Sequence, residues 1–365
     1  MKPGALGALG LAVVAAACGP RGRLEDRTTA PSIPSSAIEK VVDLDYPPGN
    51  IAVSDTGRIF FTLHPDGSPP AQVHELVDGK PVPYPSADYH DYQSVLALRI
   101  DRKGRLWALD YANYGRGQPR ILAFDLATNA EVHRYDFPPE VAGFLSMLND
   151  FQVDPDGRFI YIAEASPIRQ TPAIIVYDSV EQKSRRLLDS HPSLLPKDYL
   201  IQAPGRDMIV LGFYALHIGI DTIALDRTGA WLFYGPVNGD RLFRIATNDL
   251  RDESLSRATL ESRVENYGPK PLTDGATSDD ARNVYLTDME HSAVLTLGTD
   301  GRLRTLVKDP MLRWPDGLSF GPDGWLYLTC SSLQDVLFVS NATMRAHAPY
   351  QIFRFKPGAS APAGQ

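Results

Sequence analysis

The stretch LNDFQVDPDGRFIYIAEAS, residues 148–166, contains the pattern that decides the fold. A polar pair, Asn149 and Asp150, precedes a short strand of alternating polar and apolar residues, and a Pro-Asp-Gly turn leads into a second, apolar strand. Asp and Gly tolerate the backbone angles that a tight reversal between twisted strands requires. The stretch therefore predicts a β-hairpin with polar side chains at its start.

Variants of this hairpin recur along the chain. Six copies begin at Asn50, Ser94, Leu148, Ile220, Thr273 and Pro315. Their turns are spaced roughly fifty residues apart, which is the period of propeller blades. We therefore predict an all-β fold, a six-bladed β-propeller of four-stranded blades over residues 38–357. The N-terminal strand EKVVDLD, residues 39–45, is expected to close the sixth blade.

The composition is typical of a soluble globular domain. Hydrophobic residues make up 43% and charged residues 22% of the 365 residues. The net charge is −8 and the basic residues are scattered, whereas a protein that binds phosphate groups needs a basic face. We therefore expect a monomer that binds a small-molecule ligand and has no nucleic-acid partner.

The N-terminus resembles an export signal. An apolar run, GALGALGLAVVAAAC, follows Met1 and Lys2 and is too short to span a bilayer. Small residues directly before Cys18 resemble a bacterial lipobox, in which the cysteine is lipidated. The sequence predicts a signal peptide over residues 1–18 and a periplasmic or outer-membrane lipoprotein that contacts the membrane only through this lipid. The alternative is secretion after cleavage at an Ala-x-Ala-like site.

Two terminal segments and one further cysteine complete the expected organisation. Residues 19–37 are rich in Pro and Ser, which predicts a flexible tether, and residues 358–365 are predicted to be a disordered tail. Cys330 ends the apolar run WLYLTC and is interpreted as a buried structural thiol. If Cys18 carries lipid, no second thiol remains for an intramolecular disulfide.

Four segments carry a resemblance to a known family. They are PYPSADYHDYQSVLALRIDRKGRLWALD (83–110), PRILAFDLATNAEVHRYDFP (119–138), the stretch 148–166 and GIDTIALDRTGAWLFYGPVNGDRLFRIATNDL (219–250). In this order they resemble the Yellow and major royal jelly protein family. The resemblance implies an exported six-bladed propeller that handles small molecules; insect members are linked to dopachrome chemistry and to binding of biogenic amines. The chain lacks the paired cysteines of the insect members, as a bacterial branch would.

A more distant similarity concerns the residues at strand starts. The motifs NDF at Asn149, TDG at Thr273 and PDG at Pro315 resemble those of gluconolactonase and paraoxonase propellers. This similarity implies a divalent metal in the central tunnel, because those families hold one there.

Polar residues precede the innermost strand of every predicted blade. They are Asn50, Gln93 or Ser94, Asn149 with Asp150, Asp221, Asp274 and Asp316. Because innermost strands start at the mouth of the tunnel, these side chains are expected to converge there. Carboxylate and amide oxygens suit Ca²⁺ or another divalent metal, for which the expected ligands are Asn50, Asn149, Asp274 and Asp316. Alternatively, Asp and Asn at strand starts only satisfy backbone donors of turns.

The same mouth could carry chemistry in two ways. Metal-assisted lactone hydrolysis needs a cation that polarises the carbonyl and a carboxylate that moves protons. Dopachrome-type tautomerisation needs an acid and a base beside an aromatic wall, for which Trp314, Phe213 and Tyr214 are candidates. The expected catalytic residues are Asp316 and Asp150, and the expected ligand-binding residues are Gln93, Asp221, His217 and Tyr92. A non-catalytic binding protein for amines or small aromatic ligands, or a protein scaffold, remains an alternative.

Overall fold

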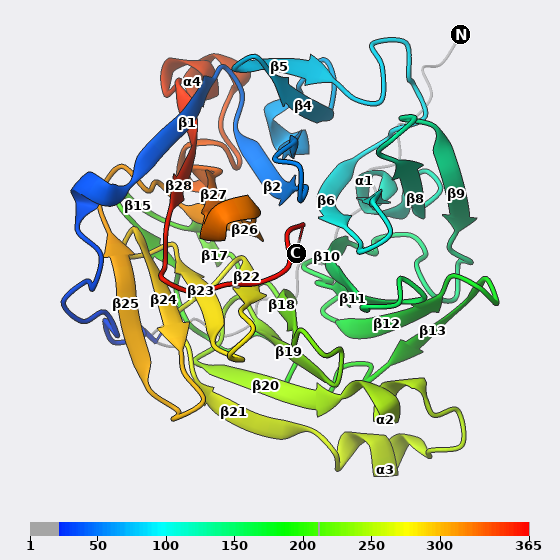
Figure 1. Cartoon of the computed structure of the whole chain (residues 1–365). Coiled ribbons are helices and arrows are strands. Elements are labelled where there is room, and N and C mark those ends of the chain that lie inside the picture. Colours follow the sequence, from blue (N-terminus) through cyan, green and yellow to red (C-terminus); the bar gives the residue numbers. More distant parts are fainter. Residues whose placement is uncertain (1–21, 211, 365) are drawn as a thin grey trace, which may run out of the picture.

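The computed structural model of the chain describes residues 22–210 and 212–364. Six four-stranded antiparallel sheets stand radially around a central axis, as the blades of a propeller do (Figure 1). The predicted all-β, six-bladed fold is confirmed. The predicted signal peptide and Cys18 lie outside the described residues.

The first five blades follow the order of the chain. Blade 1 has β2 (Pro48–Val53), β3 (Ile59–Leu63), β4 (Val73–Val77) and β5 (Lys80–Pro83). Blade 2 has β6 (Val95–Ile100), β7 (Arg105–Asp110), β8 (Arg120–Asp125) and β9 (Glu131–Asp136). Blade 3 has β10 (Leu148–Val153), β11 (Phe159–Glu164), β12 (Ala173–Asp178) and β13 (Lys183–Leu187). Blade 4 has β18 (Ile220–Leu225), β19 (Trp231–Pro236), β20 (Arg241–Ala246) and β21 (Glu265–Pro269), and blade 5 has β22 (Ala276–Ser278), β23 (Val284–Asp288), β24 (Ala293–Leu297) and β25 (Leu303–Lys308).

The sixth blade joins the two ends of the propeller. It contains β26 (Pro315–Phe320), β27 (Leu326–Cys330), β28 (Tyr350–Phe355) and, as its outer strand, β1 (Glu39–Leu44). Strand β1 pairs antiparallel with β28, with Leu44 opposite Tyr350. The predicted closing strand is therefore present, and it ends one residue before Asp45.

One repeated interaction holds the turns between first and second strands. A side-chain oxygen at the start of the turn accepts a hydrogen bond from the backbone N–H four residues later. The interaction recurs at Ser54, Asp101, Asp154, Asp226 and Asp279. In blade 5 the turn has no glycine, and Arg282 adopts the left-handed conformation there, with a φ of 66°. These local bonds explain why the turn motif repeats in the sequence.

The hydrophobic core lies between neighbouring blades. Blades 2 and 3 share a cluster that includes the buried side chains of Trp107, Phe151 and Tyr177. Blades 3 and 4 share another cluster around Tyr161 and Ile223. Each large side chain that is fully buried contributes roughly 1.5–3 kcal/mol of transfer free energy. Because each blade packs on two neighbours, the innermost strands, which carry the site, are held rigidly in place.

Residues 22–37, predicted to belong to a flexible tether, run from a contact of Gly22 with residues 198–200 to the edge of blade 5. Ser32 N and Ile33 N donate to Thr305 O and Leu306 O at 3.1 and 2.9 Å. An exposed strand edge offers unpaired backbone groups, and this segment supplies partners for those of β25. Its described part is therefore fixed to the domain, which corrects the expectation from its composition.

Residues 358–364, predicted to be disordered, cross one face of the propeller to its axis (Figure 1). Gly364 O accepts a hydrogen bond from Ile100 N at 2.9 Å, and Gly364 N donates to Phe320 O at 3.0 Å. Both partners end innermost strands, so the tail covers the end of the tunnel remote from the strand starts. The unpaired backbone groups at these strand ends explain why the tail is ordered here.

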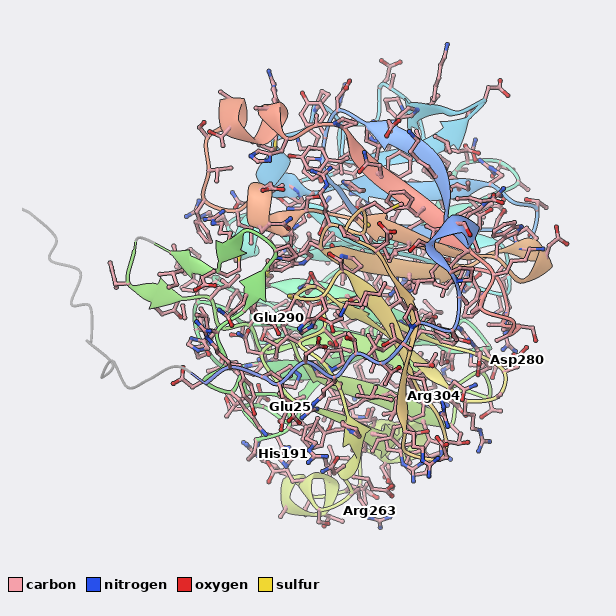
Figure 2. All side chains as sticks on the ribbon, turned by 90° about the vertical axis from the view of Figure 1, so that its left-hand side faces the viewer. Glu25, His191, Arg263, Asp280, Glu290 and Arg304 are labelled. Atoms are coloured by element: carbon pink, nitrogen blue, oxygen red, sulfur yellow. The ribbon has the colours of Figure 1, made fainter. Side chains whose placement is uncertain are left out.

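The longest connection, residues 188–219 between β13 and β18, carries two short hairpins. They are β14 (Gln202–Ala203) with β15 (Arg206–Asp207) and β16 (Ile209–Val210) with β17 (Tyr214–Ala215). They project from the side of the molecule opposite to Asp280 (Figure 2).

Short helices occupy other connections. They are α1 (Ala112–Gly115), α2 (Thr247–Arg251), α3 (Arg257–Glu261), α4 (Asn341–Ala346) and the 3₁₀ turns η1 (Ser35–Ala37), η2 (Pro65–Gly67), η3 (Pro322–Gly324) and η4 (Leu333–Asp335). Within the described ranges, none of the helices has the length and apolar character needed to cross a bilayer.

Candidate functional site

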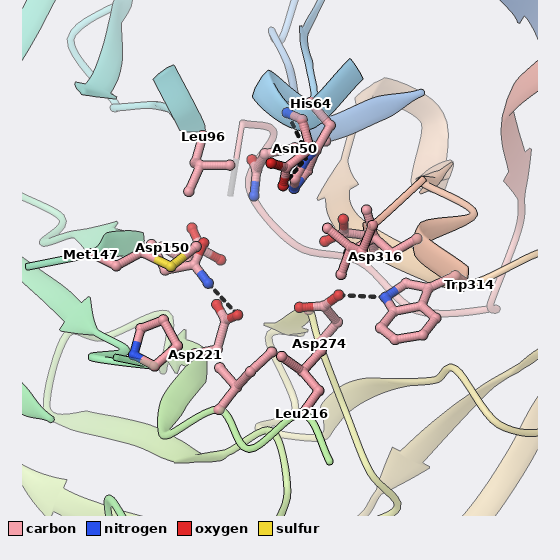
Figure 3. A pocket seen from close by; sticks show the side chains of 18 of the residues that line it. Asn50, His64, Leu96, Met147, Asp150, Leu216, Asp221, Asp274, Trp314 and Asp316 are labelled. Atoms are coloured by element: carbon pink, nitrogen blue, oxygen red, sulfur yellow. Dashed lines mark hydrogen bonds and ion pairs between the residues drawn. The ribbon is translucent and has the colours of Figure 1, made fainter. Parts of the chain in front are cut away.

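The innermost strands carry β-bulges at the end where the chain enters a blade. The register between the first two strands shifts there in blades 1, 2, 3, 4 and 6. The side chains within these shifts that reach the axis are Asn50, Leu96, Asn149, Asp150, Asp221 and Asp316. A bulge places residues outside the regular ladder and re-aims their side chains. The bulges thus direct groups that are distant in sequence into one cavity (Figure 3).

The cavity at the tunnel mouth combines acidic and apolar side chains. Its volume is about 150 Å³, comparable to an engineered cavity that accommodates benzene. The polar lining consists of Asn50, His64, Asp66, Asn149, Asp150, Asp221, Asp274 and Asp316. The apolar and aromatic lining includes Leu96, Tyr114, Met147, Leu216, Ile218, Trp314, Leu333, Leu337 and Phe338. Such a site suits a small ligand with an apolar body and a polar group.

Asp221 and Asp274 lie within hydrogen-bonding reach of each other in this cavity. Trp314 Nε1 donates to Asp274 Oδ2 at 2.6 Å, and the amide of Asn149 donates to Asp221 (Figure 3). Burial is the largest cause that raises the pKa of each carboxyl, and the charge of Asp274 raises the pKa of Asp221 further. A bond between two carboxyls requires a proton. At least one of the two carboxyls is therefore expected to hold a proton, and the hydrogen bond from Trp314 favours the ionised form of Asp274.

Arg99 forms a buried ion pair with Asp150. Its side chain is 1% exposed, and Nη2 lies 2.7 Å from Asp150 Oδ2. The other terminal nitrogen, Nη1, donates to Asn50 Oδ1 at 2.6 Å. Burial raises the pKa of Asp150, and the positive charge of Arg99 works against that shift. Arg99 therefore holds two site residues in place and offsets part of the cost of burying a carboxylate.

Asp316 brings a fourth carboxyl to the site. It touches solvent only through the cavity, and burial raises its pKa well above the usual range. The charge of Asp274 raises this pKa further, whereas a hydrogen bond with Ser331 lowers it. Like charges at such short range cannot all ionise in a buried place. The cluster therefore retains protons or attracts a cation.

Two aromatic residues of the cavity wall have a left-handed backbone. The φ angle is 58° at Tyr114 and 49° at Trp314. Tyr114 belongs to α1, whose residues from Ala112 to Gly115 all have positive φ, so α1 is a single left-handed turn. Bulky residues rarely adopt this conformation, which costs roughly 1–3 kcal/mol each, and such strain is concentrated at functional sites.

Most residues predicted from the strand starts come together. Asn50, Asn149, Asp150, Asp221, Asp274 and Asp316 all line the cavity, as does Trp314. Their convergence follows from the repeat, because equivalent positions of different blades meet at the axis. Their individual roles in binding or catalysis stay predictions.

Blade 2 departs from this rule. Gln93, predicted to bind ligand, is exposed, and its backbone N–H donates to Asp110 Oδ2 at 2.7 Å. The bulge of this blade presents Leu96 to the cavity instead. The prediction for Gln93 is therefore corrected: it lies before the bulge, and the residue directed to the axis is apolar.

Two other predicted ligand-binding residues also point elsewhere. Tyr92 packs against Tyr89 and Phe124, with ring centroids 4.7 and 6.0 Å away, in the core between blades 1 and 2. His217 directs Nε2 to Asp198 Oδ1 at 3.2 Å, although its neighbours in sequence line the cavity. Both predictions are corrected, because loop conformation rather than repeat position decides where these side chains point.

Arg99 and His64 are functional candidates that the sequence patterns missed. His64 lines the cavity, and its Nδ1 lies 3.5 Å from Asp66 Oδ2. Arg99 is the only charged residue in the run VLALRI, residues 95–100. A charge inside an otherwise apolar innermost strand is a usable signal, since buried charges require a partner.

The predicted metal ligands share the cavity without forming a ligand set. Asn50 Oδ1 already accepts from Arg99, and Asp274 accepts from Trp314. Among the residues that the structure describes, no group of three or more His, Cys, Asp or Glu side chains is placed to hold a metal ion. The donors as arranged do not fit the expected Ca²⁺ site, and a divalent metal stays a prediction.

Comparison with known sequences identifies relatives of this chain. The sequence model of the family described as major royal jelly protein matches residues 93–341. Protein yellow of Drosophila yakuba is 24% identical over 283 residues, which cover 66% of this chain and 50% of that protein. The chain thus spans about half the length of the curated relatives it matches.

Solved structures of low sequence identity share the fold. A calcium-binding protein, regucalcin, of Agrobacterium tumefaciens superposes with a TM-score of 0.58 at 15% identity, covering 92% of this chain and 100% of that one. A gluconolactonase of Xanthomonas campestris gives a TM-score of 0.55 at 12% identity, covering 87% and 88%. These similarities establish the architecture alone.

Proposed function

This chain belongs to the major royal jelly protein family, and we propose that its tunnel mouth binds a small aromatic molecule and transfers protons on it, as a tautomerase does. The observation that carries the proposal is the adjacency of the Asp221 and Asp274 carboxyls in a cavity with an apolar wall. An acid and a base whose pKa values are separated by their surroundings are the minimum that tautomerisation requires.

The two carboxyls take different roles in the proposed reaction. Asp274, ionised and held by Trp314, removes a proton from an acidic C–H or N–H group of the ligand. Asp221 donates its proton to a second ligand atom while an electron pair moves between the two positions. Asp274 then carries the proton and Asp221 the charge, and their shared hydrogen bond lets the proton return. The number of protons is conserved and no oxidant is consumed.

Neighbouring side chains position these groups. Arg99 donates hydrogen bonds to Asp150 and Asn50 and holds both side chains in place. Because its positive charge favours the ionised form of Asp150, Asp150 does not take up the proton that Asp221 and Asp274 share. The cavity wall, with Leu96 and Leu216, excludes water and strengthens the electrostatic interactions inside. Asp150 and Asp316 are the catalytic residues expected from the sequence. In this proposal they do not transfer protons, and their charges raise the pKa of Asp221.

A test compares Asp221→Asn and Asp274→Asn with a matched control. The control is Asp156→Asn, because Asp156 is an exposed aspartate in the turn at the far end of blade 3. Turnover is followed by the absorbance change of dopachrome and related aminochromes. General acid–base catalysis contributes roughly 10²–10⁴-fold, and each site variant is expected to lose about this factor while the control keeps wild-type rates. Equal rates in all three variants would contradict the proposal.

A second candidate is binding of organic amines without turnover. The observation that favours it is an excess of acidic groups, which repel one another: five aspartates line the cavity, and one of them, Asp150, pairs with Arg99. An ammonium group at Asp316 would relieve this repulsion. Calorimetric titration with aromatic amines tests it: binding that weakens in Asp316→Asn, with no product formed from any aminochrome, would favour this function over the first.

Metal-assisted lactone hydrolysis is the remaining candidate within the same site. Because Asn50 is engaged by Arg99 and Asp274 by Trp314, this function requires both side chains to release these partners and hold a cation, which would supply Lewis-acid chemistry to a lactone carbonyl. Hydrolysis of gluconolactone that requires added Ca²⁺ and is lost in Asp274→Asn would support it. Lactone turnover that persists after chelation would contradict it.

We further propose that the chain is exported and that Cys18 is lipidated. The support is the apolar run that ends in small residues before Cys18. Mass spectrometry of the protein from its native host tests this, because a lipoprotein begins at an acylated Cys18. An N-terminus upstream of this position would contradict the proposal.

A further inference from the structure

Exposed apolar side chains are gathered at one end of the propeller. Ten large hydrophobic residues of the described chain are exposed, and those at the tunnel-mouth end are Phe144, Ile168, Phe213, Tyr214, Met311 and Phe338. They include all four aromatic residues of the ten. The remaining four are valines in the third or fourth strands of blades 1 and 2 or in the β12–β13 turn at the far end. The mouth end therefore differs in surface character from the rest of the molecule.

Hydrogen bonds join the connections that carry these residues. Gln170 Nε2 donates to His217 O at 3.2 Å, which links the β11–β12 connection to the long insertion. Arg206 Nη1 donates to Leu337 O at 3.0 Å, which links the insertion to the β27–β28 connection. Phe338 also lines the cavity. Three of the connections that carry exposed apolar residues are therefore joined to one another beside the cavity.

The described N-terminal segment starts at the same end. Gly22 N donates to Asp198 O at 2.9 Å, and Leu200 N donates to Gly22 O at 3.0 Å. These partners belong to the insertion 188–219 that also carries Phe213 and Tyr214 (Figure 2). Gly22, the first described residue, is thus bound to the same connection that carries the exposed Phe213 and Tyr214.

Covalent geometry limits the distance between Gly22 and the proposed lipid. Cys18 precedes Gly22 by four residues, and four residues span at most about 14 Å. A lipid on Cys18 therefore enters the bilayer within about this distance of the insertion. The insertion belongs to the mouth end of the propeller, so the mouth end is the one that faces the place where this lipid enters the bilayer.

We propose that the mouth end of the propeller rests on a lipid bilayer, with Phe213, Tyr214 and Phe338 inserted into the interface and the cavity open toward the membrane. This contact adds to the lipid anchor, which the sequence alone indicated as the sole attachment. It depends on the exposed apolar residues and is independent of the reaction that the cavity performs.

The energetics favour an apolar contact over an electrostatic one. The net charge of −8 and the absence of a basic run in the sequence do not match an anionic surface. Aromatic rings, in contrast, are stable at the level of lipid headgroups. The apolar face therefore supplies an attachment in addition to the lipid on Cys18. The ligand of the cavity then enters from the lipid interface.

The test uses the full chain with Cys18→Ser, in which Cys330 is the only native thiol and is buried. A reporter cysteine is added as Phe213→Cys or Phe338→Cys, and as Val180→Cys in the control. Val180 is 67% exposed, in the turn between β12 and β13 at the far end, against 56% for Phe213 and 65% for Phe338. Each variant receives a polarity-sensitive fluorophore and is titrated with phosphatidylcholine–phosphatidylethanolamine vesicles.

The expected result is a blue shift of the emission at both mouth positions and none at the control position. An equal response at both ends, or no response at any lipid concentration, would overturn the proposal. A response that depends on protein concentration without vesicles would place a second copy on this face and would also overturn it.

A second measurement uses variants that carry no fluorophore, so the label cannot affect membrane binding. Flotation of the Cys18→Ser chain with the same vesicles is compared for Phe213→Ser and Val180→Ser. Loss of one buried aromatic side chain corresponds to partitioning that is about tenfold weaker. The proposal expects this loss for Phe213→Ser alone, and equal flotation of both variants would contradict it.

Discussion

The two ends of the propeller use the same residue type in opposite ways. At the turn end, each aspartate finds donors within a few residues: Asp101 accepts from the backbone N–H groups of Lys103 and Arg105 and from Trp107 Nε1 at 2.8 Å. At the mouth end, Asp221 and Asp316 face other carboxyls, and their pKa values rise. An aspartate in a turn stabilises the fold through hydrogen bonds. An aspartate at the mouth is destabilised in its charged form by neighbouring carboxyls, and its pKa is raised.

Backbone geometry shows the same contrast. At the turn end glycine takes the left-handed position in most turns between first and second strands, as at Gly104, with a φ of 72°, and Arg282 takes it in blade 5. The mouth end places Tyr114 and Trp314 in that conformation instead. Strain at bulky residues persists only where surrounding structure enforces it. The comparison teaches that the repeats build the scaffold and that departures from the repeat mark the site.

The largest effect on stability is expected at the turn end. Asp101→Ala removes the partner of Trp107 Nε1 and of two backbone N–H groups, and breaks the ion pair with Arg105. Leaving these donors unpaired is expected to lower the free energy of unfolding by about 3 kcal/mol. Denaturant unfolding measures it. The exposed Asp156→Ala is the control, and a similar loss in both variants would remove the contrast between the ends.

A pH dependence is expected from the mouth end. The pKa of Asp221 in the folded protein lies well above its ordinary 3.8, so between these values the native state binds more protons than the unfolded state. The free energy of unfolding therefore falls as pH rises through this window, by up to about 1.4 kcal/mol per pH unit for one proton. The difference between wild type and Asp221→Asn isolates this slope. An identical pH profile in both proteins would contradict the raised pKa.

Asp316→Asn is expected to stabilise the fold at alkaline pH. It removes a charge that Asp274 and Asp150 repel and keeps an acceptor for Ser331. We expect a gain of about 1 kcal/mol at pH 8, together with weaker ligand binding. Thermal unfolding at pH 8 and pH 5 measures the change. A stabilisation that depends on the charge of Asp316 is expected at pH 8 and is smaller at pH 5, whereas an effect of side-chain shape is the same at both. A loss of stability at both pH values would mean that the carboxylate of Asp316 supports the fold.

The smallest effect is expected from metal removal. Because the donors of the site are engaged by Arg99 and Trp314, chelation is expected to leave the thermal midpoint unchanged. A metal that binds only the native state would raise the midpoint with its concentration. Metal analysis of the purified protein and unfolding with and without Ca²⁺ provide the measurement, and a concentration-dependent rise would restore the metal site expected from the sequence.

The sequence contains much of the fold and part of the site. The turn motif is local, so its six copies could be counted, and equivalent positions such as Asn50 and Asp316 could be placed at the axis. The orientation of His217 and the bulge that presents Leu96 depend on tertiary contacts and could not be predicted. The same holds for Arg99, because both faces of an innermost strand are buried and alternation does not reveal which one meets the axis.

The central claim is that Asp221 and Asp274 share a proton in the folded protein. Infrared difference spectroscopy at neutral pH measures it directly, since a protonated carboxyl absorbs apart from carboxylates. We predict a protonated-carboxyl band of equal intensity in the wild type and in the control Asp156→Asn, and a weaker band in Asp221→Asn, because Asp316 also has a raised pKa and can keep its proton. A wild-type protein without this band, or a band of unchanged intensity in Asp221→Asn, would contradict the account.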